Sequence, residues 1–279
     1  MPESVSAVVA RLAATLPAHE ARLLVAHVLG VEPGRLLLAA PPTPAQRAEL
    51  DALAARRAGG EPLQHVTGLA PFRTVELAVG PGVFIPRPET EVMTGWVLER
   101  LAELPGRPVV VELCAGSGAI TKALATEHPG ADYHCVELSP DAHAYLVRNV
   151  AGLDVDVRLG DMADAFADLD GSVDVVVANP PYVPLEHWAD VPAEVRDFDP
   201  TLALVSGQDG LDAMRVVADV AARLLRPGGR VAAEHAEVQE ESAPAVFVRH
   251  GGFDQVADHP DLVGRPRFVT ARRGGRMAP

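Results

Sequence analysis

The chain has 279 residues, a formal net charge of −14, and hydrophobic side chains at 48% of its positions. This length suits one large domain plus a small one, and the apolar content is sufficient for a buried core. The acidic balance disfavours a protein that binds nucleic acid through a diffuse positive field, and it fits a protein or small-molecule substrate better.

No apolar run is long enough to span a bilayer, and the N-terminus lacks a basic-then-apolar signal pattern. We therefore predict a cytoplasmic protein without a membrane partner. Its two cysteines, Cys114 and Cys135, each lie in an apolar strand-like segment. They are predicted to be buried thiols, and neither a disulfide framework nor a metal site is expected.

Leucines at helical spacings predict a small bundle of helices over residues 1–61. Thr43 is the expected N-cap of a helix that starts at Pro44. The segment carries no catalytic constellation, so we interpret it as a domain for recognising the substrate.

Glycines punctuate short apolar runs between residues 62 and 87, which predicts a β-hairpin linking two domains. From residue 88 strand and helix patterns alternate, which predicts a parallel sheet covered on both faces. The expected helices are 88–103, 118–128, 140–150, 210–225 and 238–250. The expected strands are 108–113, 132–138, 154–159, 173–178 and 229–234, followed without an intervening helix by 253–258 and 266–272. The last pair predicts an antiparallel edge, and the long irregular connection 181–208 is expected to be functional.

The first candidate ligand site is a strand that runs into a glycine turn, from Val109 to Gly118. Glycines there let a ligand approach the backbone at the carboxyl end of the sheet. Thr121 stands where a dinucleotide-binding motif needs its third glycine, and no P-loop lysine follows, which disfavours a pyrophosphate ligand. The candidate cofactor-binding residues in this segment are Glu112, Cys114, Ala115, Gly116, Ser117 and Gly118.

Two acids at the ends of the next strands extend this site. Glu137 follows Gly118 by 19 residues, where a carboxylate can accept both ribose hydroxyls; the alternative is a solvated acid at a strand end. Asp161, beside an adenine, can accept from its exocyclic amine with Met162 packing on the ring; taken singly, the two would be turn residues. Together with the turn, these residues describe an adenosine without phosphates, which indicates S-adenosyl-L-methionine as the cofactor.

The string Asn179-Pro180-Pro181-Tyr182 follows the apolar strand 173–178 and is the strongest candidate acceptor site. Proline fixes φ and has no N–H, so the carbonyl oxygens are expected to point outward in a rigid frame, with Tyr182 as a flat wall. Such a site accepts hydrogen bonds from a planar NH2 group, in a carboxamide or in the exocyclic amine of a base. A proline-rich turn that merely ends a strand is the alternative, which the full string after a buried strand disfavours.

With these motifs the chain resembles the class I methyltransferases. More narrowly, it is similar to the protein-(glutamine-N5) methyltransferases of the HemK/PrmC type, which modify peptide-chain release factors. The similarity covers most of the chain, including the helical N-terminal region, and runs through Gly60–Gln64, Phe84–Glu91, Cys114–Gly118, Asn179–Tyr182, Gly207–Leu211 and Asp261–Arg265. Asn-Pro-Pro-Tyr is shared with adenine-N6 methyltransferases, whereas the Pro-Arg-Pro-Glu-Thr-Glu string is far more selective.

The resemblance implies a Rossmann-like, mostly parallel sheet with an antiparallel last strand, in a methyltransferase domain over residues 88–279. It implies direct in-line transfer of a methyl group to the side-chain nitrogen of the glutamine in a release factor's Gly-Gly-Gln motif. In that reaction the Asn179 side-chain oxygen and the Pro180 carbonyl each accept one N–H of the glutamine. Arg87 either borders the site or forms a structural ion pair. The implied substrate-binding residues are Asn179, Pro180, Pro181, Tyr182, Phe84 and Arg87, and Asn179 also contacts the cofactor.

The chain departs from the family pattern at three places. Cys114-Ala115 stands for the usual Gly-Thr, Met162 for a frequent Trp, and Asp199-Pro200 for a frequent Glu-Pro. None of these changes removes a group that the chemistry requires.

Other functions remain open from the sequence. The first is methylation of adenine N6 in nucleic acid, although no stable nucleic-acid binding is expected from the charge. A related glutamine or asparagine methyltransferase with another protein substrate is the second. A non-catalytic, cofactor-binding adaptor and a nicotinamide dehydrogenase are less favoured, because Asn179–Tyr182 and Glu137 are intact and Thr121 replaces a glycine.

Overall fold

The computed structural model describes residues 3–275, so residues 1–2 and 276–279, at the ends of the two expected domains, lie outside the described residues. The chain divides into two compact units. One contains the residues up to Leu69 together with Ala193–Phe198, and the other contains 70–192 and the chain from Asp199 onward.

The first unit is built from helices. They are α1 (Val5–Leu12), α2 (Ala18–Leu29), the 3-10 helix η1 (Pro33–Leu38), α3 (Pro44–Ala58), α4 (Leu63–Thr67) and α8 (Ala193–Phe198). The predicted start of α3 is confirmed: Thr43 and Gln46 form a reciprocal capping box, with Pro44 at the first helical position. Helix α8 is tied to this unit by an ion pair of 2.8 Å between Arg57 and Glu194.

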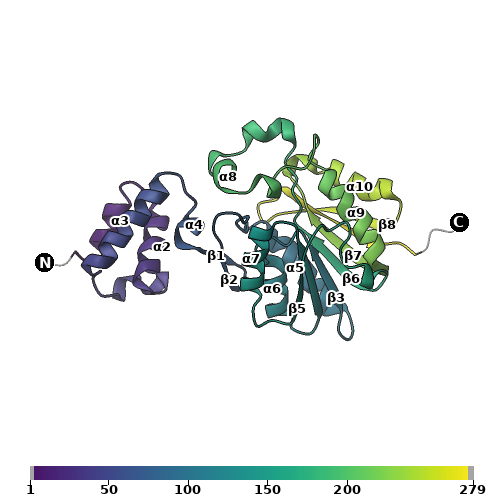
Figure 1. Ribbon diagram of the computed structural model, residues 1–279, viewed down its shortest axis with the longest axis horizontal. Coiled ribbons are helices and arrows are strands. Elements are labelled where there is room, and N and C mark those ends of the chain that lie inside the picture. The colour runs from purple at the N-terminus through teal and green to yellow at the C-terminus, as the bar shows by residue number, and fades with distance from the viewer. Residues whose placement is uncertain (1–2, 276–279) are drawn as a thin grey trace. The chain divides into compact units, whose positions relative to one another are not determined.

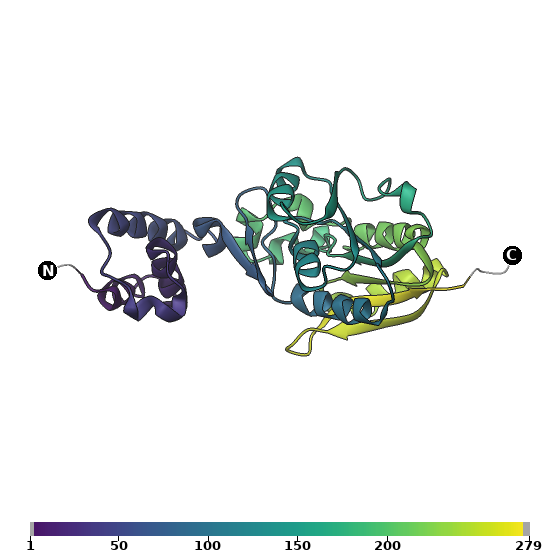
Figure 2. The same ribbon diagram turned by 90° about the horizontal axis from the view of Figure 1, so that it is seen from below.

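A seven-stranded sheet forms the centre of the second unit, in the order β5-β4-β3-β6-β7-β9-β8. The strands are β3 (Val109–Leu113), β4 (Asp132–Glu137), β5 (Val155–Leu159), β6 (Val173–Ala178), β7 (Leu225–Glu234), β8 (Phe253–Pro260) and β9 (Pro266–Arg273). The first five in sequence pair in parallel, whereas β9 is antiparallel to both β7 and β8. The predicted mostly parallel sheet with an antiparallel edge is therefore confirmed, and Figure 2 shows β8 and β9 as the yellow hairpin.

Helices cover both faces of this sheet (Figure 1). Helices α5 (Thr90–Glu103), α6 (Ala119–Glu127) and α7 (Pro140–Asn149) lie on one face, and α9 (Asp212–Leu224) and α10 (Ser242–His250) lie on the other. Alternate residues of β3 enter the two cores, Val110 on the first face and Val111 on the second. A parallel strand buried on both faces has the continuous apolar sequence seen here.

Strand β3 lies between β4 and β6, so the direction in which strands are added to the sheet reverses there. At such a switch point the connections leave the carboxyl ends of β3 and β6 toward opposite faces, and a crevice opens between them. The fold thereby brings the glycine turn after β3 and the Asn179 string after β6 to the same place.

Several element boundaries differ from expectation. The hairpin, β1 (Leu69–Phe72) and β2 (Val75–Ala78), is preceded by helix α4, so the expected linker begins with a helical turn. Strand β7 begins at Leu225 rather than 229, because Pro227 and two glycines conceal a stretch that pairs with β6 through an irregular register. The connection 181–208 contains α8 and the 3-10 helices η3 (Leu185–Asp190) and η4 (Thr201–Ala203). Within the described residues, no helix combines the length and the apolar character needed to cross a membrane.

Candidate functional site

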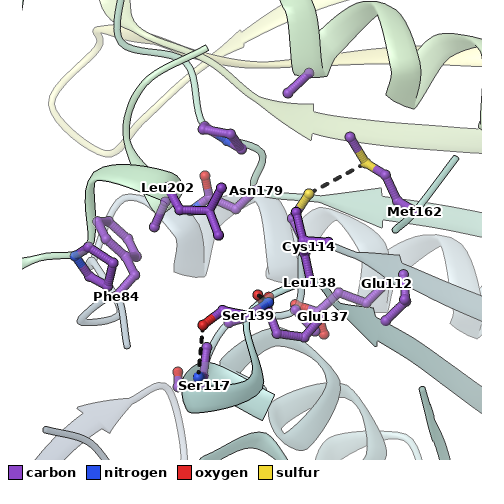
Figure 3. Close-up of a pocket in the computed structure, with 18 of the residues that line it drawn as sticks. Phe84, Glu112, Cys114, Ser117, Glu137, Leu138, Ser139, Met162, Asn179 and Leu202 are labelled. Carbon is purple, nitrogen blue, oxygen red and sulfur yellow. Dashed lines mark hydrogen bonds between the residues drawn. The ribbon is translucent and has the colours of Figure 1, made fainter. Parts of the chain in front are cut away.

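A cavity of about 370 Å³ lies at the carboxyl ends of β3, β4 and β6 and is lined entirely by residues of the second unit. Figure 3 shows Cys114, Glu137 and Asn179 around the same space. The structure brings together twelve predicted site residues in its lining: Phe84, Glu112, Cys114, Ala115, Gly116, Ser117, Glu137, Asp161, Met162, Asn179, Pro181 and Tyr182. The remaining three, Arg87, Gly118 and Pro180, do not line it.

The glycine turn has an unusual backbone. Gly116 and Gly118 have φ values of 55° and 80°, in the left-handed region. A Cβ on Gly118 would lie 2.6 Å from Leu146 Cδ1 of α7, so glycine is required there by packing behind the turn. Gly118 therefore lets the turn pack closely against α7 and does not itself line the cavity.

Cys114 also has a positive φ, 57°, which costs a non-glycine residue about 1–2 kcal/mol. Its thiol lies against the Met162 sulfur at 3.5 Å, the contact drawn as a dashed line in Figure 3. Burial raises the pKa of Cys114, so the group remains a neutral thiol rather than a nucleophile.

Glu137 is held by the backbone of two turns. One carboxylate oxygen accepts from the Gly116 amide at 2.8 Å, and the other accepts from the Ser139 amide at 2.7 Å. A carboxylate offers about four acceptor positions, so two remain for a ligand. The arrangement fits a vicinal diol such as that of ribose.

Glu112 lies beneath the turn and is almost fully buried. It accepts from the Thr121 amide at 2.8 Å and from the Thr121 hydroxyl, which fastens the first turn of α6 to β3. Burial, with a smaller contribution from the nearby charge of Glu137, raises the pKa of Glu112 to about 8. Thr121, where a dinucleotide motif would have glycine, is thus a partner for this acid.

Asp161 and Met162 close the side of the cavity beyond β5. Asp161 Oδ1 accepts from the Ala163 amide at 2.9 Å, which leaves its second oxygen available to a donor in the cavity. The Gly160 amide donates to the Glu137 carbonyl at 2.9 Å, so this loop is fixed to the end of β4. The glycine turn, together with Glu137 and Asp161, whose carboxylates each keep acceptor positions for a ligand, fits an adenosine-bearing cofactor. Among the described residues no group of three or more His, Cys, Asp or Glu side chains is placed to hold a metal ion.

The Asn179 string is fixed from several sides. The Asn179 side-chain nitrogen donates to Thr90 Oγ1 at 3.2 Å. The Tyr182 amide donates to the Leu204 carbonyl at 3.1 Å, and the Tyr182 carbonyl accepts from Gln239 Nε2 at 3.1 Å. A Cβ on Gly210 would lie only 2.3 Å from that carbonyl oxygen. The backbone beside Asn179 is therefore clamped between two loops.

Arg87 forms the structural ion pair that the sequence left open. Its guanidinium donates to Asp199 Oδ2 at 2.5 Å and lies 4.9 Å from the centre of the Phe84 ring. Asp199 also accepts from the Ile85 amide at 3.3 Å. The pair anchors the connection that supplies Pro200, Leu202 and Leu204 to the cavity wall.

Sequence reasoning missed Glu234, Thr90 and Gln239. Glu234 is 1% exposed and ends β7 at the same edge of the sheet as Asn179. Its carboxylate accepts from the Thr90 hydroxyl at 2.6 Å and from the Tyr182 hydroxyl at 3.3 Å. An acid that ends an otherwise apolar buried strand was the signal that marked it.

Family models match segments in both units of the chain. A family model described as the PrmC N-terminal domain matches residues 4–68, and one described as a methyltransferase domain matches residues 110–198. A release factor glutamine methyltransferase of Streptomyces coelicolor is 50% identical over 262 residues, which cover 92% of this chain and 91% of the relative. Another protein of that name, from Mycolicibacterium smegmatis, is 44% identical over 276 residues, which cover 98% and 97%.

A further relative has a different name. A 4-amino-L-phenylalanine/4-methylamino-L-phenylalanine methyltransferase of Streptomyces pristinaespiralis is 39% identical over 266 residues, which cover 93% of this chain and 89% of that protein. Among solved structures, the hMettl16 catalytic domain in complex with a 3′UTR hairpin matches with a TM-score of 0.57 at 13% identity, covering 84% of this chain and 83% of that one. At that identity the likeness shows the fold alone.

Proposed function

The chain belongs to the family of release factor glutamine methyltransferases, and from this premise we propose how its cavity transfers a methyl group. The protein is an S-adenosyl-L-methionine-dependent enzyme that methylates a glutamine of peptide-chain release factors. We infer that the acceptor atom is the side-chain amide nitrogen of the glutamine in the Gly-Gly-Gln loop. The single observation that carries this proposal is the Asn179 carboxamide, which lines the same cavity as the ribose-type acid Glu137.

The cofactor, when bound, supplies an activated methyl group on a sulfonium. Glu137 would accept the ribose hydroxyls and Asp161 the adenine amine, while Gly116 permits close approach of the backbone. The buried Glu112 would support the turn from beneath through Thr121. Glu137 and Asp161 can take these roles because their hydrogen bonds to backbone amides leave other acceptor positions on both carboxylates unused.

An amide nitrogen is a weak nucleophile because its lone pair is delocalised into the carbonyl, so orientation is the enzyme's main contribution. The Asn179 Oδ1, in the cavity lining, and by the family resemblance the carbonyl of Pro180, which lies outside that lining, would each accept one N–H of the glutamine and turn the nitrogen toward the methyl group. Both oxygens would also stabilise the positive charge that develops there. Orientation of this kind lowers a barrier by up to about 10 kcal/mol.

Phe84 and Tyr182 would enclose the glutamine side chain, and Pro181 lines the cavity beside them. Arg87 would act indirectly, by holding Phe84 and the Asp199 connection in place. A protein loop that reaches the partly aromatic wall of this cavity would present its glutamine at an extended tip.

We propose that the N-terminal helical unit recognises the body of the release factor. In this unit Leu37 and Leu38 are 81% and 86% exposed, which favours docking of a protein surface. The first 69 residues carry six basic and six acidic side chains, so the whole charge of −14 lies in the rest of the chain. The net acidic charge of the catalytic unit supports a protein substrate over a nucleic acid.

The test is to incubate the protein with labelled S-adenosyl-L-methionine and purified release factor, and then to locate the label by mass spectrometry. Label on the glutamine of the Gly-Gly-Gln loop is expected, and a release factor with that glutamine replaced should remain unlabelled. Label confined to added DNA or RNA would instead support adenine methylation. Free 4-amino-L-phenylalanine serves as the small-molecule competitor, and its preferential methylation would refute the protein substrate.

The Asn179→Ala variant tests the acceptor site itself. Transfer should nearly cease while calorimetry shows unchanged cofactor affinity. Retention of more than a tenth of the wild-type rate, a barrier change below about 1.4 kcal/mol, would refute the assigned role.

A further inference from the structure

Behind Asn179 lies a chain of hydrogen bonds that ends at a buried acid. The Asn179 Nδ2 group donates to Thr90 Oγ1 at 3.2 Å, and the Thr90 hydroxyl donates to Glu234 Oε2 at 2.6 Å. The Tyr182 hydroxyl donates to the other oxygen of Glu234 at 3.3 Å. The carboxamide and the aromatic ring of the Asn179 string therefore share one carboxylate.

This chain determines which way the Asn179 carboxamide faces. Thr90 has a single hydroxyl hydrogen, and an ionised Glu234 can only accept, so that hydrogen must go to Glu234. Thr90 Oγ1 can then only accept from Asn179, which places the amide nitrogen inward. The Asn179 oxygen is thereby directed to the cavity.

The surroundings of Glu234 set the pKa of its carboxyl group close to neutral pH. Burial first, and to a smaller extent the charge of Glu89 before α5, raise the pKa of Glu234 to about 7. The Thr90 hydroxyl, the positive charge of Arg267 on β9 and the Tyr182 hydroxyl act in the opposite direction. The neighbouring His235 is engaged elsewhere, with its Nε2 2.7 Å from Asp258 on β8.

We propose that Glu234 is a positioning residue for methyl transfer: acting through Thr90, it orients and polarises the Asn179 carboxamide, and acting through Tyr182, it fixes the wall of the acceptor site. Glu234 itself does not line the cavity, whereas Thr90, Asn179 and Tyr182 do. An anion at the end of a hydrogen-bonded chain strengthens each bond along it. The Asn179 oxygen then becomes a better acceptor where positive charge develops on the substrate nitrogen.

This inference rests on the proposed role of Asn179 and predicts a specific pH profile. Because the chain requires ionised Glu234, kcat of the wild-type enzyme should rise with pH through about 7 and level off above it. In Glu234→Gln this acid limb should disappear, and kcat should fall by one to two powers of ten. The KM for release factor and the cofactor Kd should stay within about threefold, because Glu234 contacts neither.

Two matched pairs of variants test the path through Thr90. Thr90→Val keeps the shape but removes the hydroxyl and should reproduce the loss of kcat, whereas Thr90→Ser should restore activity. Thr94→Val is its control, because Thr94 is buried one turn further along α5 and donates only to the Thr90 carbonyl at 3.0 Å. Glu237→Gln, at an exposed acid just beyond β7, is the control for Glu234. Both controls should keep the wild-type profile.

The outcomes separate this inference from the proposed function. If Asn179→Ala is inactive but Glu234→Gln keeps both kcat and the acid limb, the chain of hydrogen bonds has no positioning role, and the proposed function stands. If Asn179→Ala remains active, both proposals fail together. Should Glu234→Gln fold poorly, the Thr90→Val and Thr90→Ser pair decides, and equal activity of the two would overturn the inference.

Discussion

Gly210 packs against the acceptor site without lining it, and the Gly210→Ala variant tests whether the Asn179 string must be rigid. A Cβ at this position would lie 2.3 Å from the Tyr182 carbonyl oxygen, 2.7 Å from Gln239 Nε2 and 3.0 Å from Pro184 Cδ. Ordinary contact begins at 3.4 Å, so the Tyr182 carbonyl must retreat by about 1 Å. A displacement of that size at a distance from the reacting atoms can lower a rate about 100-fold.

We therefore expect Gly210→Ala to lower kcat by about 100-fold with cofactor affinity unchanged, because the residues proposed to hold the ribose and the adenine, Glu137 and Asp161, lie at the end of β4 and beyond β5. The positive φ of 76° adds backbone strain of about 1–2 kcal/mol, which will lower the thermal stability. Gly152→Ala is the matched control: φ there is 86°, but no atom lies within 4 Å of the added Cβ. It should lose stability and keep kcat. Equal kcat in the two variants, measured with release factor at saturating cofactor, would refute the argument from rigidity.

Three further predictions address the cofactor turn and the entrance. Glu137→Ala should weaken cofactor binding at least 30-fold by calorimetry, because two charge-assisted hydrogen bonds of about 1.5–3 kcal/mol each are lost, and unchanged affinity would contradict the ribose assignment. The folded-state pKa of Glu112, about 8, lies above its usual 4.5, so this acid destabilises the fold progressively as pH rises between those values. The free energy of unfolding of Glu112→Gln, measured by denaturant titration, should therefore gain on that of the wild type as pH rises, and the gain should be several kcal/mol larger at about pH 8 than at about pH 5. An advantage independent of pH would contradict the shifted pKa. Asp199→Asn leaves Arg87 without its charged partner, so it should raise KM for release factor and cost about 1–3 kcal/mol of stability. An unchanged KM would show that the ion pair has no influence on substrate binding.

The sheet could be predicted because β3 and β6 are buried on both faces and therefore have continuous apolar sequences. Helix α3 was predictable from its cap, since Thr43, Pro44 and Gln46 act through local contacts. The start of β7 was missed because Pro227 is a strong local signal for a loop, whereas the pairing of Leu225 with β6 depends on distant residues. Local signals therefore identified most elements but not all of their ends.

The candidate site divides in the same way. The glycine turn and Glu137 were recognisable because their spacing along the chain reflects their position in the fold. Glu234 was not, since its partner Thr90 becomes visible only when the N-terminus of α5 is placed at the end of β7. For Arg87 the sequence allows a place beside the site or an ion pair, and only the folded connection shows its partner to be Asp199.

The two halves of the cavity differ in how far along the chain their contacts reach. Those that hold the cofactor turn join residues 9 and 21 positions apart, Thr121 to Glu112 and Gly116 to Glu137. Those that hold the acceptor side include one of similar reach, Tyr182 to Leu204, but also two that join residues 114 and 144 positions apart, Ile85 to Asp199 and Thr90 to Glu234. Closing the longer loops costs more chain entropy, so we expect the acceptor half to form later in folding and to open first under mild denaturation. Partial unfolding should accordingly abolish methyl transfer before it abolishes cofactor binding, and we expect a nascent chain to become active only after β7 has joined the sheet.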